Sequence, residues 1–164
     1  MACIIKQMPS WKDYVDSMMA TNKLNHAAIL GFQDSKVYAS SPGFLLSMHP
    51  ASLEVGKDET KEFVVDEFDV LKGLINNEGI VKTPPGIWLN NQHFRLVEFR
   101  AEGTTANPRC TIYLKCKNGG ATIVKTHKLI ILAIWSNEND PNKNGGFCNS
   151  VVEGIAEEFI KADY

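Results

Sequence analysis

The chain has 164 residues, of which 44% are hydrophobic and 22% are charged, a composition that is ordinary for one globular domain. Its formal net charge of -2 argues against a nucleic-acid binder that works through overall basicity. No apolar run approaches the roughly 20 residues that cross a bilayer, and the N-terminus lacks the apolar core of a signal peptide. We therefore expect a single cytoplasmic domain, residues 1–164, that does not bind nucleic acid.

The four cysteines and four histidines are scattered along the chain, and no two cysteines have Cys-x-x-Cys spacing. This pattern does not suit a structural zinc site, so we expect neither a metal nor a cofactor. In a reducing compartment the cysteines are expected to be free thiols. Cys148 follows a glycine-rich loop, a setting that can activate a thiol, but no orienting partner or oxyanion hole accompanies it. We therefore predict that the protein is not an enzyme.

The chain is expected to open with a helix and two strands. Ser10 is a good N-cap, and Asp13 stands where the acidic partner of a capping box belongs. Apolar side chains then recur at helical spacing, which predicts an amphipathic helix over residues 10–20. Residues 27–32 are apolar, and residues 37–40 follow them after turn-forming residues, so both segments are predicted to be strands.

The middle of the chain is less regular. Segment 51–67 is charged and weakly patterned, and no element is predicted for most of it. Asp66 is a candidate cap for a short helix. Residues 87–99 are typical of a hairpin that turns at Asn90-Asn91, whose side chains tolerate positive φ. Residues 101–108 are expected to form a polar loop.

The last third contains the clearest strand patterns. Residues 110–116 alternate between apolar and polar, which predicts a strand with one buried face. Residues 121–126 and the wholly apolar 129–135 follow after short turns, and the second of these is expected at the centre of the sheet. After a polar loop, residues 147–162 are predicted to form a helix. Its apolar stripe comprises Phe147, Val151, Ile155 and Phe159, widened by Val152 and Ile160.

Strands joined by tight turns predict an antiparallel sheet, because parallel strands need longer crossovers. Two amphipathic helices at the ends of the chain need a sheet face to cover. The expected fold class is α+β. We expect a central antiparallel sheet with the N- and C-terminal helices packed together on one face and short helical segments on the other.

Taken in chain order, these segments resemble the profilin family. Its N-terminal helix begins Ser-Trp shortly before a Tyr, as residues 10–14 (Ser-Trp-Lys-Asp-Tyr) do here. The hairpin at Asn90-Asn91 resembles the family's glycine-turn hairpin, and residues 145–149 (Gly-Gly-Phe-Cys-Asn) resemble the start of its last helix. The resemblance lapses in an extra N-terminal leader, residues 1–8, and in a longer, charged stretch at 50–80. It suggests a divergent, protist-type member.

Aromatic residues at the two ends of the chain indicate a peptide groove. Trp11 and Tyr14 lie three apart on a predicted helix and so share a face. Polyproline II peptides present rings and bare carbonyls every third residue, which flat aromatic side chains match. The resemblance implies a poly-proline-binding groove of Trp11, Tyr14, Tyr38, Phe159 and Tyr164, with Tyr38 where many members have tryptophan. The alternative is that Trp11 and Phe159 only fill the interface between the terminal helices.

A basic stretch indicates a second surface. Between Gly103 and Asn137 there is no acidic residue. Lys115 and Lys117 lie two apart on a strand and project from one face, where they could steer an acidic partner or form a solvated outer face. The resemblance implies an actin-binding surface made of His93, Arg95, Lys115, Lys117, Asn144, Gly146 and Asn149.

The resemblance implies a monomeric protein that binds actin monomers, regulates polymerisation and speeds nucleotide exchange on actin. It implies proline-rich partners such as formin-type nucleators. Lys115, Lys117 and Lys125 are candidate ligands for phosphoinositide headgroups, against the alternative of no meaningful lipid binding. A second function also stays open, a proline-rich-peptide-binding adaptor of the same fold with little actin affinity.

Overall fold

A computed structural model describes residues 9–81 and 86–164; the expected leader 1–8 lies outside the described residues. Seven strands form one antiparallel sheet in the order β2-β1-β9-β8-β7-β6-β5. They are β1 (His26–Gly31), β2 (Val37–Ser40), β5 (Ile87–Leu89), β6 (Gln92–Gly103), β7 (Pro108–Cys116), β8 (Gly119–Lys125) and β9 (Leu129–Ser136). The expectation of a central antiparallel sheet is confirmed.

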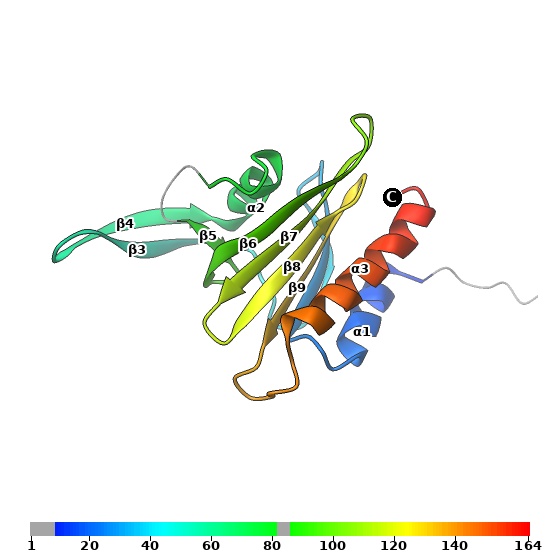
Figure 1. Cartoon of the computed structure of the whole chain (residues 1–164), viewed down its shortest axis with the longest axis horizontal. Helices are drawn as coiled ribbons and strands as arrows, with labels where there is room; N and C mark the ends of the chain where they lie inside the picture. The colour runs from blue at the N-terminus through cyan, green and yellow to red at the C-terminus, as the bar shows by residue number, and fades with distance from the viewer. Residues whose placement is uncertain (1–8, 82–85) are drawn as a thin grey trace, which may run out of the picture.

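Three helices cover the two faces of this sheet: α1 (Trp11–Ala20), α2 (Glu67–Asn76) and α3 (Gly145–Lys161). Figure 1 shows α1 and α3 side by side on one face, with α2 on the other. None of the helices in residues 9–81 and 86–164 is long and apolar enough to cross a membrane. The predicted pairing of the terminal helices on one face is confirmed.

Strand β9 explains why both faces need covering. Ile131 and Ala133 pack with α1 and α3, while Leu132 and Ile134 pack in the cluster that includes α2. Successive side chains of a strand point to opposite faces, so a strand that is apolar throughout must be buried on both. The prediction of a central, fully covered strand is confirmed.

The structure corrects three local predictions. The weakly patterned segment is a β-hairpin, β3 (Met48–Gly56) paired with β4 (Glu59–Asp66), which extends away from the main sheet (Figure 1). The pattern is weak because most of its side chains are exposed. The predicted loop 101–108 is shorter, since β6 continues to Gly103 and β7 starts at Pro108. In α3 the buried residues are Cys148, Val152, Ala156 and Phe159, so Val152 and Phe159 are buried as predicted, whereas Phe147 is exposed.

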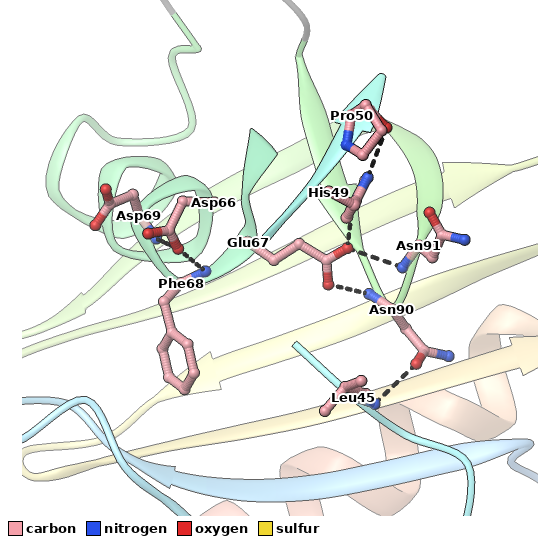
Figure 2. A network of polar contacts seen from close by, with 9 residues as sticks. All are labelled: Leu45, His49, Pro50, Asp66, Glu67, Phe68, Asp69, Asn90 and Asn91. Atoms are coloured by element: carbon pink, nitrogen blue, oxygen red, sulfur yellow. Dashed lines mark hydrogen bonds and ion pairs between the residues drawn. The ribbon is translucent and has the colours of Figure 1, made fainter. Parts of the chain in front are cut away.

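A buried acidic side chain anchors the hairpin to the body of the protein (Figure 2). The carboxyl group of Glu67, fully buried at the start of α2, accepts hydrogen bonds from the backbone N–H groups of Asn90 and Asn91 at 2.7 and 2.9 Å. Nε2 of His49 on β3 lies 2.6 Å from the same group. The Asp66 side chain caps the helix as predicted. The base of the hairpin, α2 and the β5–β6 turn are therefore joined at one point.

Candidate functional site

The N-terminus of α1 holds Trp11 in place. Ser10 Oγ accepts from the N–H of Asp13 at 3.1 Å, and Asp13 Oδ2 accepts from the N–H of Ser10 at 2.9 Å. This reciprocal capping box satisfies two backbone donors and stabilises the first turn. Trp11 is therefore the first residue of a well-defined helix, and its ring starts from a fixed backbone.

The C-terminus of α3 turns Tyr164 back toward the same place. Asp163 adopts a left-handed conformation with φ of 66°. The N–H of Tyr164 donates to Phe159 O at 2.9 Å and the N–H of Asp163 donates to Ile160 O at 3.2 Å. These are the two hydrogen bonds of a Schellman motif, which reverses the chain after a helix. Because of this reversal, Tyr164 lies over the last turn of α3.

The rings from both ends of the chain meet in one cluster, here called the aromatic slot: Trp11, Tyr14, Tyr38, Phe159 and Tyr164. The Trp11 ring centroid lies 5.4 Å from Tyr38, 5.6 Å from Phe159 and 5.4 Å from Tyr164. Tyr14 contacts Phe159 at 4.7 Å between ring centroids. All five predicted groove residues are therefore brought together.

Burial divides the aromatic slot into a floor and a rim. Phe159 is 3% exposed and packs in the core between the helices and the sheet. Tyr38 and Tyr164 are 37% and 36% exposed, and Trp11 and Tyr14 are half-buried. Phe159 thus fills the helix interface, as the alternative interpretation holds for it, while the other four rings face solvent in part.

The orientation of Tyr38 depends on a residue that the sequence did not single out. Tyr38 Oη donates to Asp34 Oδ2 at 2.6 Å, and this hydrogen bond raises the pKa of Tyr38 and lowers that of Asp34. A side chain on Gly31 would meet the Tyr38 hydroxyl at 2.3 Å, so glycine makes room for the ring. Asp34 lies in the turn between two strands and precedes Tyr38 by four residues. This spacing across a turn is the sequence feature that could have indicated the contact.

The predicted actin-facing residues form a second feature, here called the basic hollow: His93, Arg95, Lys115 and Lys117. These side chains line one depression of about 500 Å³. Arg95 on β6 is paired with Lys115 on β7, so their side chains lie on the same face of the sheet. Sequence spacing linked Lys115 with Lys117, strand pairing adds Arg95, and His93 lines the same depression.

The remaining predicted actin residues lie at the start of α3. Asn144 is the N-cap, and its side-chain oxygen accepts from the N–H of Phe147 at 3.0 Å. Asn149 is half-buried, with its side-chain oxygen accepting from Thr122 Oγ1. Gly146 is exposed. Asn144 thus has a capping role of its own, and Asn149 joins α3 to β8.

Lys125 does not lie with the other two candidate phosphoinositide ligands. It is 6% exposed, and its Nζ donates to the carbonyls of Pro108 and Thr126, both at 2.9 Å. Burial lowers the pKa of its ammonium. Successive residues of β8 are buried on both faces, so Lys125 is held inside rather than presented to an anion in solvent.

The three cysteines that the structure describes show no sign of activation. Cys110, Cys116 and Cys148 are free thiols. Cys148 is fully buried, and burial raises its pKa to about 11, the opposite of what a nucleophile needs. In the described part of the chain no cluster of three or more His, Cys, Asp or Glu side chains could hold a metal.

The predicted actin residues of α3 and the aromatic slot lie at opposite ends of this helix. Gly146 is near its start and Phe159 near its end, so about 20 Å of helix separates them at about 1.5 Å per residue. No residue belongs to both the aromatic slot and the basic hollow.

The sequence and the fold of this chain are similar to those of known proteins. The profilin family model matches residues 9–164. The chain is 28% identical to a profilin of Tetrahymena pyriformis, covering 96% of this chain and 100% of the relative. It is also 28% identical to a profilin of Saccharomyces cerevisiae, covering 94% and 99%. The solved structure of Acanthamoeba castellanii profilin IA superposes with a TM-score of 0.68, 25% identity, and coverage of 94% and 100%. The chain belongs to the profilin family.

Proposed function

We propose that this protein binds actin monomers through the basic hollow and the start of α3, and that it binds proline-rich peptides in the aromatic slot. The observation that carries the peptide-binding proposal is the convergence of five rings from α1, β2, α3 and the residue Tyr164 beyond α3. Two binding surfaces on one small protein would let it deliver an actin monomer to a proline-rich partner.

The chemistry of the aromatic slot suits a polyproline II ligand. Such a helix has no internal hydrogen bonds, so its carbonyls seek external donors. The indole N–H of Trp11 and the hydroxyl groups of Tyr14 and Tyr164 have no hydrogen-bond partner among residues 9–81 and 86–164. They can donate to peptide carbonyls while the rings pack on proline. The Tyr38 hydroxyl is already engaged by Asp34 and would contribute its ring face.

A structural neighbour suggests the partner class. A solved structure shows mouse profilin IIa in complex with a double repeat from the FH1 domain of mDia1; its TM-score is 0.52 at 16% identity, which establishes the shared fold. We propose that proline-rich segments of formin-type nucleators are the corresponding partners of this protein. Tyr38 in place of a larger indole reduces the area that stacks on proline.

The basic hollow supports the second half of the proposal. His93, Arg95, Lys115 and Lys117 are exposed and carry no ion pair within the described residues. Unpaired surface cations keep their full attraction for an acidic partner and favour fast association. On actin, this contact would regulate polymerisation and speed nucleotide exchange. Lys115 and Lys117 also remain candidates for phosphoinositide headgroups.

A titration of fluorescent actin monomers, with and without a saturating proline-rich peptide, tests both surfaces. We expect actin binding in both conditions with similar affinity, because the surfaces are separate, and retention of the protein on poly-proline resin. Retention on the resin without any effect on actin would replace the proposal by the adaptor alternative. If the protein is not retained on the poly-proline resin, the proposed peptide groove is wrong.

A further inference from the structure

A third depression lies directly beside the aromatic slot, and no role has been assigned to it. It has a volume of about 500 Å³ and shares Tyr164 with the slot. We call it the flank pocket. Its side chains relevant here are Arg109, His127, Lys128, Ile160, Asp163 and Tyr164.

The side chains that line the flank pocket carry a net positive charge. Arg109 and Lys128 are cationic, and Asp163 is the only acidic side chain that lines the pocket. In the described part of the chain neither cation forms an ion pair or donates a side-chain hydrogen bond. His127 adds a further ring N–H donor.

Two tight turns hold these groups in position. Thr126 and Leu129 close the β8–β9 turn through N–H to O hydrogen bonds of 2.9 and 3.1 Å, which places His127 and Lys128 at its tip. Thr104 and Asn107 close the facing β6–β7 turn at 3.2 and 3.1 Å. Preformed turns reduce the entropy lost when a ligand binds.

We propose that the flank pocket binds the carboxylate of an aspartate or glutamate next to a proline-rich segment that occupies the aromatic slot. The ligand is therefore an acidic-flanked proline-rich peptide rather than a bare run of prolines. The inference rests on the proposed groove and adds a specificity determinant to it.

The distances fit a short connection between the two sites. Lys128 Nζ lies 5.8 Å from the ring centroid of Tyr164, which lies 5.4 Å from that of Trp11. The ammonium is therefore at most about 11 Å from the Trp11 ring, which three to four residues of polyproline II span at about 3.1 Å each. An acidic side chain three or four residues beyond the proline on Trp11 can therefore reach Lys128.

The test compares peptides of about eight prolines that carry two glutamates or two glutamines at one end, with each end tried in turn because the direction of the bound peptide is open. Isothermal titration calorimetry gives a dissociation constant for each. We expect one glutamate-flanked peptide to bind about two- to tenfold more tightly than its glutamine control, because each partly exposed ion pair contributes modestly. The preference should shrink at high salt.

Protein variants test which side chains cause the preference for a glutamate-flanked peptide. The readout for each protein is the ratio of its two dissociation constants, so a general loss of affinity cancels. Lys128→Glu should abolish the glutamate preference and create one for a lysine-flanked peptide. Asp163→Asn should enlarge the glutamate preference, and asparagine tolerates the left-handed conformation at this position. Lys57→Glu, with the same charge change at the remote hairpin tip, should leave the ratio unchanged.

Three outcomes would overturn the inference. Equal affinity for the glutamate-flanked and glutamine-flanked peptides would contradict the proposed role of the flank pocket and would leave the proposed groove unaffected. If no proline peptide binds, both the proposed groove and this inference are wrong. If inositol trisphosphate bound the wild type but not Lys128→Glu, with no flank preference, the pocket would be a phosphoinositide headgroup site instead.

Discussion

His49 and Glu67, 18 residues apart in the chain, meet at 2.6 Å where the β3–β4 hairpin joins the body of the protein. The other ring nitrogen of His49 donates to Pro50 O at 3.0 Å. Both nitrogens thus face oxygen atoms that can accept a hydrogen bond, an arrangement that favours the doubly protonated imidazolium. The hydrogen bond to Pro50 raises the pKa of His49, the carboxyl group of Glu67 raises it further, and burial opposes both.

This contact predicts a pH-dependent stability. The folded pKa of His49 is raised above its unfolded value of about 6.5. Its stabilisation is therefore complete below that pH and is lost as pH rises through the folded pKa. We expect the free energy of unfolding, measured with urea, to fall more steeply over this window in the wild type than in His49→Gln. The difference between the two proteins removes the contributions of the other histidines. Parallel curves would contradict the prediction.

Glu67→Gln should destabilise the protein by about 1–3 kcal/mol, because a buried donor is left without an acceptor. The glutamine amide has one oxygen where the carboxyl group has two, and its NH₂ would face the N–H of Asn90 or Asn91. Urea denaturation gives the change. Glu62→Gln, an exposed position on the same hairpin, is the matched control and should change stability by less than about 0.5 kcal/mol. Similar stability losses in both variants would contradict the role of burial.

Trp11→Ala should weaken binding of a proline-rich peptide by about 1–3 kcal/mol, as loss of a central aromatic contact does. The ring touches Tyr38, Phe159 and Tyr164, so its removal opens the centre of the aromatic slot. Calorimetry measures the affinity, and circular dichroism checks the fold. Phe147→Ala removes an exposed aromatic side chain at the other end of α3 and should bind the peptide normally. Unchanged affinity in a folded Trp11→Ala protein would place the groove elsewhere.

Lys115→Glu combined with Lys117→Glu should impair actin binding and spare proline peptides. Both side chains line the basic hollow, and neither touches the aromatic slot. Inhibition of spontaneous actin polymerisation is the readout. Lys57→Glu with Lys61→Glu on the β3–β4 hairpin has the same charge change and is the matched control. A folded Lys115 and Lys117 variant that sequesters actin as well as the wild type would show that the hollow is not the actin contact.

The amino-acid sequence by itself determined the elements with strong local signals. The capping box of Ser10 and Asp13 and the helical spacing after it marked α1. The unbroken apolar run of β9 required a central strand covered on both faces. The order of these motifs also indicated the family, and through it the five residues of the aromatic slot.

Only the tertiary structure decided which distant groups meet. Lys125 reads as one more surface lysine, yet β8 places it against buried carbonyls. Glu67 opens a helix like many exposed acids, yet it is buried between a hairpin and a turn. Arg109 and Lys128 share the flank pocket with Tyr164, whose position depends on the reversal after α3. The physical reason is that periodicity reports which side of an element faces the core, whereas contacts between turns depend on strand order and on the path of the chain beyond each helix.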